Sequence, residues 1–405
     1  MIYIVSLAVF SFVIFILVGL LLFVESRVAS TGENTITINS DPDKALKISG
    51  TPSLLSALGN NGIFLPSACG GSGSCGMCKC VVSRGGGAIL PTELAHLSRQ
   101  DKQQGKRLSC QLKVKTDLDI MVPESIFGIS KFEATVLSNY NISTYIKELI
   151  LKPDTPLVFK AGSYIQIDVP EYQVCFKDFC IDSRFVSEWK KYNLLELTSS
   201  GVVPGFRAYS LANPPHEKDL LKMTVKIATP PPGTLGIPPG FGSSYVFGLE
   251  PGDRVVVSGP YGDFFVKENS REKCFVGGGA GIAPLRCHVL DQLEGGKNSG
   301  QKVSLWYGAR TIKDICYHDT FTKLQSLYSN FSYQVSLSQP DPEDGQWNGK
   351  VGYIQSHLAK EYLSIHNDPT EIEFYLCGPP MMVDAIVETL DRFGVDESMI
   401  FYDKF

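Results

Sequence analysis

Residues 275–284 read Phe-Val-Gly-Gly-Gly-Ala-Gly-Ile-Ala-Pro, and this stretch decides the fold of the C-terminal part of the chain. An apolar run precedes it and a helix-like run, residues 285–293, follows it. The pattern predicts a glycine turn that joins a buried strand to a helix. Backbone at such a turn can approach a pyrophosphate closely. The stretch departs from the G-x-G-x-x-G pattern because Pro284 occupies the last position.

Strands and helices alternate on both sides of this turn. Apolar stretches at 274–276, 303–307 and 373–376 alternate with helical patterns at 320–329 and 381–393. This alternation predicts a parallel sheet with crossover helices, an α/β fold. Cys377-Gly378-Pro379-Pro380 follows the last of these strands. Open α/β sheets bind ligands at such strand ends, although an ordinary strand-to-helix turn explains the motif equally well.

The preceding region, residues 131–268, has little helical periodicity. Short β-branched stretches at 134–136, 164–169, 221–228 and 254–258 are separated by Gly and Pro turns. They predict an antiparallel β-barrel or sandwich.

Two motifs lie within this β-rich region. Arg207-Ala208-Tyr209-Ser210 combines a forked cation, an aromatic face and a hydroxyl near a strand end. Gly240-Phe241-Gly242-Ser243 opens a helix turn suited to an anion. Each motif taken alone also fits a plain strand end or a capped helix.

A loop rich in glycine and cysteine carries the strongest chemical signal. Its ligand-type residues are Cys69, Cys75 and Cys78, with Cys110 further along, which gives C-x5-C-x2-C and a remote fourth thiol. Four cysteines can hold a 2Fe-2S cluster, for which the plant-type spacing is one residue shorter. The glycines among them permit turns with positive φ, so that backbone N–H groups can approach the cluster sulfurs.

Structural zinc is the main alternative for the same thiols. Zinc ribbons usually supply two C-x2-C pairs, whereas Cys110 is solitary. A Rieske centre needs histidines, and none lies near the loop in the sequence. Haem attachment is excluded because Lys79 follows Cys78, and Cys80 is interpreted as a buried small hydrophobe.

The residues around this loop predict a compact α+β unit that ends near residue 130. Residues 35–38 and 81–82 have strand patterns, and Leu108 to Val114 is predicted to form a strand around Cys110. A helix is expected to start at Thr51-Pro52 and to stop at Asn61-Gly62. A second, short helix is expected to be capped at Ser98.

The N-terminus predicts a membrane anchor. Ile2 to Val24 comprises 23 residues without a formal charge. As a helix it covers roughly 34 Å, against a hydrocarbon core of about 30 Å. A cleaved signal peptide is the alternative, but no Lys or Arg precedes the apolar run. Because Arg27, Lys44 and Lys47 follow it, the bulk of the chain is expected in the cytoplasm.

Composition excludes several other classes of protein. The chain has 405 residues, with 37 Lys and Arg against 42 Asp and Glu, for a net charge of −5. Without a basic run, nucleic acid is not an expected partner. The 11 cysteines are too few for a disulfide scaffold at this length.

The order of these motifs resembles the ferredoxin–NADP reductase superfamily. Its flavin barrel carries R-x-Y-S and G-x-x-S, and its nucleotide domain carries G-x-G-x-x-P and C-G-P. With the apolar N-terminus, a vertebrate-type ferredoxin loop and the stretch KIATPPPGTLGIPPGFGSSY, the whole chain resembles the family of the F subunit of sodium-translocating NADH:quinone reductases. Residues 171–201 are similar to an insertion in that family's barrel.

The resemblance implies four parts. These are a transmembrane helix (1–26), a β-grasp 2Fe-2S ferredoxin-like domain (31–130), an antiparallel FAD-binding barrel (131–268) and an α/β NADH-binding domain (269–405).

It also implies roles for individual residues. Arg207 would pair with a flavin phosphate, Tyr209 would pack on the isoalloxazine, and Ser210 would hydrogen-bond N5. The FAD pyrophosphate would contact Gly240, Gly242 and Ser243. The dinucleotide turn would comprise Gly279, Gly281 and Pro284, with Cys377 and Gly378 near the nicotinamide. Among these, Ser210, Tyr209 and Cys377 are the predicted catalytic residues, and Cys69, Cys75, Cys78 and Cys110 are the predicted cluster ligands. One of the terminal aromatics, Phe401, Tyr402 or Phe405, would shield the flavin.

The expected reaction is NADH oxidation, with a hydride passed to FAD and single electrons passed to the 2Fe-2S cluster. Hydride transfer requires no general acid or base, and the sequence shows no convincing His/Asp pair. The resemblance further implies a single-pass protein of the bacterial inner membrane, with its catalytic domains on the cytoplasmic side. Other membrane subunits would reduce a quinone and pump sodium.

Three questions stay open at the level of sequence. NADPH is an alternative substrate, because Arg310 could meet a 2′-phosphate. The reductase component of a bacterial oxygenase is the second interpretation of the whole chain. A tethered iron–sulfur redox sensor without enzymatic activity is the third.

Overall fold

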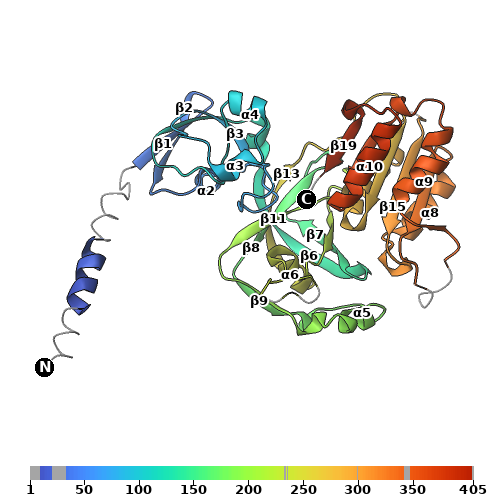
Figure 1. Cartoon of the computed structure of the whole chain (residues 1–405), viewed down its shortest axis with the longest axis horizontal. Helices are drawn as coiled ribbons and strands as arrows, with labels where there is room; N and C mark the ends of the chain where they lie inside the picture. The colour runs from blue at the N-terminus through green and yellow to red at the C-terminus, as the bar shows by residue number, and fades with distance from the viewer. Residues whose placement is uncertain are drawn as a thin grey trace. The chain divides into compact units, whose positions relative to one another are not determined.

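The computed structural model describes residues 10–20, 33–231, 234, 236–298, 300–341 and 347–403 (Figure 1). Beyond the N-terminal helix, the described chain divides into two compact units. The first comprises residues 33–67 and 71–128, and the second comprises residues 68–70 and 129–403.

The apolar N-terminus is described only in part. Residues 10–20 are helical and their large apolar side chains are exposed. The remainder of the predicted span from Ile2 to Val24 lies outside the described residues. Among the helices that are described, none has both the length and the apolar character needed to cross a membrane.

The first unit is built on a mixed five-stranded sheet in the order β2-β1-β5-β3-β4. Strands β1 and β5 run parallel, and the other neighbours are antiparallel. The strands are β1 (Glu33–Ile38), β2 (Asp41–Ser49), β3 (Lys79–Arg84), β4 (Lys106–Leu108) and β5 (Leu118–Met121). Its helical segments are α2 (Leu54–Asn60), α3 (Pro91–Leu94), α4 (Arg99–Gln103) and η1 (Glu124–Gly128).

Two local predictions for this unit are wrong. Helix α2 begins at Leu54 rather than at Thr51-Pro52, because the Ser53 hydroxyl accepts a hydrogen bond from the Ser56 N–H at 3.2 Å and caps the helix there. The strand predicted from Leu108 to Val114 ends at Leu108. The Leu108 carbonyl accepts turn hydrogen bonds from the N–H groups of Gln111 and Leu112, so Cys110 lies in a turn.

Two other local predictions are confirmed. The first helix stops at Asn61, and Ser98 caps α4 in a reciprocal pair with Asp101.

The second unit contains an antiparallel barrel. Its six strands follow the order β11-β8-β13-β6-β7-β12, and a bridge between Leu211 and Met223 joins the two ends of that order. The strands are β6 (Ser130–Ser143), β7 (Ile146–Pro153), β8 (Tyr164–Val169), β11 (Gly205–Ser210), β12 (Leu221–Lys226) and β13 (Arg254–Tyr261). Helix α6 (Phe241–Gly248) packs near β12.

The predicted insertion forms a small subdomain on this barrel. It contains the hairpin of β9 (Tyr172–Cys175) and β10 (Thr198–Gly201), together with η2 (Phe176–Asp178), α5 (Val186–Lys191) and η3 (Leu194–Glu196). Phe176 and Trp189 are fully buried and belong to the barrel core. The insertion is therefore part of the barrel's packing.

The rest of the second unit is the predicted parallel sheet. Its order is β17-β16-β15-β14-β18-β19, and every pairing is parallel. The strands are β14 (Lys273–Gly278), β15 (Val303–Ala309), β16 (Phe331–Leu337), β17 (Lys350–Val351), β18 (Glu373–Cys377) and β19 (Ile400–Asp403). The helical segments are η4 (Gly279–Gly281), α7 (Ile282–Leu293), η5 (Ile312–Asp314), α8 (His318–Leu327), α9 (Ile354–Glu361), η7 (Leu363–Ile365), η8 (Pro369–Glu371), α10 (Pro380–Arg392) and η9 (Glu397–Met399).

Helices cover both faces of this sheet. One apolar core joins the sheet to α7 and α8, and a second joins its other face to α9 and α10. Alternate strand residues divide between the two, since Phe275 lies in the first core and Cys274 and Val276 lie in the second. With both faces covered, the open ends of the strands are the places where a ligand can bind.

Candidate functional site

The glycine turn and the Cys377-Gly378 motif lie against each other at the carboxyl ends of β14 and β18. A Cβ atom added at Gly281 would stand 2.2 Å from the Cys377 carbonyl oxygen. Gly279 has a φ of 58°, a conformation that favours glycine. Pro284 lies in the first turn of α7, where its missing N–H costs nothing. A side chain at position 281 would therefore not fit, and glycine leaves the backbone at the start of α7 open to a ligand.

The two predicted flavin motifs lie against each other on the barrel, as the glycine turn and Cys377-Gly378 do on the parallel sheet. Arg207, Tyr209 and Ser210 lie on β11, and Gly240 caps α6. A Cβ atom added at Gly242 would stand 2.4 Å from Arg207 Cγ and 3.0 Å from Tyr209 Oη. The N-terminus of α6 thus approaches a guanidinium and a phenol closely, which is a suitable arrangement for a phosphate group beside an aromatic ring.

The Ser243 hydroxyl, predicted to contact the FAD pyrophosphate, forms hydrogen bonds with the protein backbone. Its hydroxyl accepts a hydrogen bond from the Ala228 N–H at 3.1 Å and donates one to the Gly240 carbonyl at 3.2 Å. The side chain therefore ties the preceding loop to α6.

An acid that sequence reasoning missed joins the barrel to the parallel sheet. Ser210 Oγ donates a hydrogen bond to Asp403 Oδ2 at 3.3 Å. Asp403 ends β19, where it is the register partner of Cys377 on β18. Ser210, Asp403 and Cys377 are therefore brought together from three strands, although 193 residues separate the first two.

Burial raises the pKa values of Asp403 and Cys377. It raises the pKa of Asp403 to about 6, because the hydrogen bond from Ser210 offsets only part of the burial and Asp263 adds like charge. Burial, and then the nearby Asp403, raise the pKa of the Cys377 thiol well above its ordinary value. Cys377 is thus a neutral thiol and not a nucleophilic thiolate.

The three terminal aromatic residues proposed to shield the flavin have different environments in the structure. Phe401 stacks on Tyr375 with ring centroids 4.9 Å apart and lies under the Lys267 ammonium, so it belongs to the packing of the sheet. Tyr402 is exposed, and Phe405 lies outside the described residues.

The cysteine loop is shaped by glycines. Gly71, Gly73 and Gly76 have φ values of 90°, 85° and 68°. Cys78 and Cys110 are buried, and hydrogen bonding between the two thiols raises the pKa of Cys78. Cys75 is half-buried, while Cys69 lies in the segment 68–70 that groups with the second unit.

These observations fit a polynuclear thiolate cluster. The candidate donors are all cysteines, and positive φ values of this kind allow backbone N–H groups to turn toward cluster sulfurs. A 2Fe-2S cluster divides its four thiolates between two irons.

One histidine lies near this loop in space although it is distant from it in the sequence. His96 packs directly on it, since a Cβ atom at Gly76 would stand 2.8 Å from His96 Nδ1. It is nevertheless the single histidine between residues 33 and 128, and a Rieske centre requires two.

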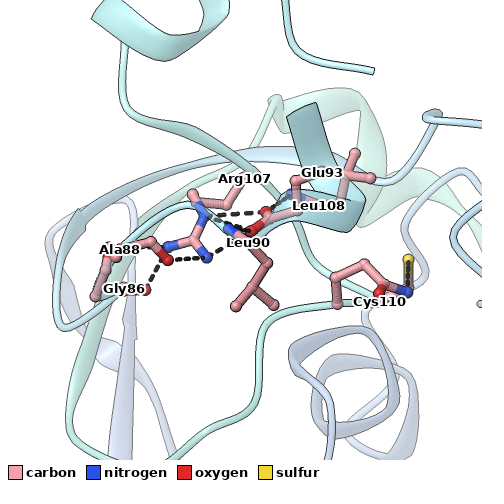
Figure 2. Close-up of polar contacts among 9 residues, drawn as sticks. Gly86, Ala88, Leu90, Glu93, Arg107, Leu108 and Cys110 are labelled. Atoms are coloured by element: carbon pink, nitrogen blue, oxygen red, sulfur yellow. Dashed lines mark hydrogen bonds and ion pairs between the residues drawn. The ribbon is translucent and has the colours of Figure 1, made fainter. Parts of the chain in front are cut away.

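A buried ion pair that sequence reasoning missed supports the turn around Cys110 (Figure 2). Arg107 Nη2 lies 2.7 Å from Glu93 Oε2, and both side chains are almost fully buried. The guanidinium also donates to the carbonyls of Gly86, Gly87 and Ala88. Glu93 accepts hydrogen bonds from the N–H groups of Leu90 and Leu108. All members are paired, so this network joins α3, the preceding loop and β4 two residues before Cys110.

Three known domain families match the chain in the expected order. They are the 2Fe-2S iron-sulfur cluster binding domain (residues 36–115), the oxidoreductase FAD-binding domain (194–266) and the oxidoreductase NAD-binding domain (275–388). The FAD, NAD and 2Fe-2S predictions are confirmed at this level, and the individual ligand residues stay predictions.

Solved structures agree with this three-part fold. The cytochrome P450 reductase GcoB of Amycolatopsis is similar with a TM-score of 0.65 and 24% identity, covering 92% of this chain and 98% of its own. The ferredoxin reductase of carbazole 1,9a-dioxygenase has a TM-score of 0.61 and 25% identity over the same shares. The three domain families, on a fold that these structures share, therefore define an iron–sulfur flavoprotein reductase with a nicotinamide dinucleotide domain.

Relatives define the family within this class. The F subunit of the Na(+)-translocating NADH-quinone reductase of Neisseria meningitidis is 46% identical over 404 residues, 99% of each chain. The proteins of the same name in Marinomonas sp. and Klebsiella pneumoniae are 46% and 45% identical, again over 99% of this chain and 98% and 99% of theirs. The chain belongs to this family, that of the F subunit of Na(+)-translocating NADH-quinone reductases.

Proposed function

We propose that this chain is the NADH-oxidising subunit of a sodium-translocating NADH–quinone reductase. The observation that carries the proposal is the relation at about 46% identity over 99% of both chains, all three domain families included. When bound, FAD accepts a hydride and the 2Fe-2S cluster carries single electrons. The protein's own task is to hold these groups in order and to exclude water between them.

The barrel would hold FAD at the junction of β11 and α6. Arg207 supplies positive charge, the N–H groups at the start of α6 supply donors, and Gly240 and Gly242 leave room for a phosphate. Burial raises the pKa of the Tyr209 phenol, so this ring stays neutral and offers a flat apolar face. Ser210 ends the same strand and directs its hydroxyl toward Asp403.

The parallel sheet would hold NADH along its carboxyl ends. The glycine turn with Gly279, Gly281 and Pro284 would receive the pyrophosphate at the N-terminus of α7. Cys377 and Gly378 lie beside that turn. Because Ser210 and Cys377 both lie next to Asp403, a nicotinamide ring above Cys377 would face the barrel strand that carries Ser210.

The cysteine loop would hold the cluster through Cys69, Cys75, Cys78 and Cys110. The predicted boundaries at 31–130, 131–268 and 269–405 divide the chain after its N-terminal segment into three modules. The N-terminal 26 residues would anchor the chain in the bacterial inner membrane as a single pass, with the three modules in the cytoplasm. Partner subunits would reduce the quinone and move sodium, because the apolar N-terminus has none of the carboxylates of an ion pathway.

The oxygenase-reductase interpretation is supported by a likeness of fold at 24–25% identity. The full-length relation at 46% identity is far closer, so we give that interpretation second place.

The test is to purify the full chain from membranes with whatever accompanies it. We expect bound flavin and iron–sulfur absorbance, several membrane subunits, and NADH–quinone reductase activity that rises with sodium. A preparation that accompanies a soluble hydroxylase and ignores sodium would favour the oxygenase alternative. A preparation without flavin would favour the redox sensor.

A further inference from the structure

A pocket of about 330 Å³ lies beside the carboxyl ends of β15 and β16. Three parts of the second unit line it. Arg310, Asp314 and Asp341 follow the two strands, Tyr145 lies in the turn between β6 and β7, and Glu188 with Lys191 lies on α5 of the insertion. Its size suits a small-molecule site.

Helix α5 forms one wall of this pocket and is held against the barrel by Trp189. Trp189 is fully buried, and its Nε1–H donates to the Thr144 carbonyl at 2.8 Å, next to Tyr145. The same indole stacks on Phe247 of α6 with ring centroids 6.0 Å apart. Because Glu188 precedes this anchor directly in the sequence, its backbone is fixed relative to the barrel.

The pocket continues the proposed dinucleotide site. Strand β15 is the direct neighbour of β14, which ends in the glycine turn. Tyr307 connects the two places, since its hydroxyl lies 3.2 Å from the Gly279 carbonyl oxygen and 3.5 Å from that of Asp314. A dinucleotide whose pyrophosphate occupies the glycine turn can therefore extend over β15 into the pocket.

We propose, on the basis of the proposed function, that this pocket receives the adenosine half of NADH and that Glu188 of the insertion selects against a 2′-phosphate. The ribose 2′-hydroxyl of NADH can donate to a carboxylate, whereas the 2′-phosphate of NADPH would meet like charge. Tyr145 and Tyr192 offer flat aromatic faces of the kind on which adenine stacks.

The charges around the pocket support this selection. Its three carboxylates, Glu188, Asp314 and Asp341, equal its three cations in number. Two of the cations already face acids: Lys191 Nζ lies 3.6 Å from Glu188 Oε1, and Arg310 Nε lies 3.6 Å from Asp314 Oδ2. Asp314 therefore partly neutralises the charge of Arg310, as Glu188 partly neutralises that of Lys191.

The decisive variant is Glu188→Lys in the flavin-loaded full chain, with Glu196→Lys as the matched control. Glu196 is exposed, lies in the same insertion and does not line the pocket. Flavin reduction is followed with NADH and with NADPH. We expect Glu188→Lys to raise the NADPH-to-NADH ratio of kcat/KM about tenfold or more, mainly through a lower KM for NADPH, as one reversed charge pair can. Glu196→Lys should leave the ratio unchanged.

A binding measurement separates this inference from the proposed function. ADP-ribose and 2′-phospho-ADP-ribose are titrated calorimetrically, because neither can be oxidised. We expect Glu188→Lys and, to a smaller extent, Glu188→Gln to favour the phosphorylated probe. If wild type oxidises NADH but neither substitution alters the preference, the assignment of Glu188 is wrong and the proposed function stands. If wild type oxidises neither nicotinamide cofactor, the proposed function fails, whatever the probes do.

Discussion

At the scale of single residues, the hydroxyl of Ser210 is the group that the proposed function ties most directly to hydride transfer. It ends β11 and donates to Asp403 at 3.3 Å. We expect Ser210→Ala to slow NADH-to-flavin hydride transfer by roughly 10- to 100-fold, because the hydrogen bond proposed between this hydroxyl and the flavin would be lost. FAD affinity should change less, since Arg207 and α6 remain. Stopped-flow reduction and FAD titration measure the two effects.

Ser200→Ala is the matched control, because Ser200 is an exposed serine on β10. It should change neither quantity. Equal hydride-transfer rates for Ser210→Ala and wild type would contradict the role given to Ser210.

Asp403 supplies a prediction about pH. Its pKa rises from 3.8 to about 6 on folding, so the folded chain binds this proton more tightly than the unfolded chain. The stabilisation is full below about pH 4 and is lost as the pH rises through 6. Relative to Asp403→Asn, which cannot titrate, wild type should therefore lose roughly 1 to 3 kcal/mol between pH 4 and 7.5. Thermal unfolding of both flavin-free proteins at the two pH values measures the difference, and parallel pH profiles would contradict it.

Two of the segments that meet near Asp403 carry local sequence motifs and could be predicted from the sequence. Arg207 to Ser210 and Cys377-Gly378 each carry a recognisable order of residue types. Asp403 carries none, because an aspartate near a chain end has no local signature. Its role arises only when β19 pairs with β18 and places it next to Cys377.

At the scale of elements, prediction succeeded where the chain must bury an apolar face. The barrel strand predicted at 164–169 is β8, and the strand predicted at 303–307 is the core of β15. It failed around Cys110, where apolar residues at 108, 112 and 114 are buried by a turn and not by a strand. Alternating burial alone does not distinguish the two.

The buried pair of Glu93 and Arg107 joins α3 to β4. Burial alone would raise the pKa of Glu93, but hydrogen bonds from Arg107, Leu90 and Leu108 hold it below its ordinary value. Glu93→Gln leaves the guanidinium buried without its counter-charge. We expect this substitution to destabilise the first unit by about 3 to 5 kcal/mol. The iron–sulfur absorbance should be lost at a lower denaturant concentration than in wild type.

Asp119→Asn provides the comparison for an exposed pair in the same unit. Asp119 lies 2.7 Å from Arg84, and the Arg84 side chain is 64% exposed. The unfolding midpoint should hardly move, since exposed ion pairs contribute little. Equal shifts for the two variants would show that burial of Glu93 and Arg107 is unimportant.

At the scale of the whole molecule, a unit that carries three of the four proposed cluster ligands is distinct from a two-domain reductase unit, with which Cys69 groups. Barrel and parallel sheet belong to one compact unit, joined by contacts such as Ser210 with Asp403 and Arg286 with the Ala212 carbonyl. The sequence order of the motifs predicts which modules are present. It does not predict these contacts, because they depend on how two folded domains pack.

This division predicts that the two halves of the reaction can be uncoupled. Cys110→Ala removes one proposed ligand within the first unit and leaves the second unit intact. We expect the 2Fe-2S absorbance and electron paramagnetic resonance signal to disappear, while NADH reduces the flavin within about twofold of the wild-type rate, since that step needs only the second unit. Cys80→Ala is the matched control, because Cys80 is also buried, lies on β3 and is not a proposed ligand, so its cluster should persist. Joint loss of the cluster and of flavin reduction in Cys110→Ala would mean that the second unit depends on the first for its folding. Survival of the cluster would instead remove Cys110 from the ligand set.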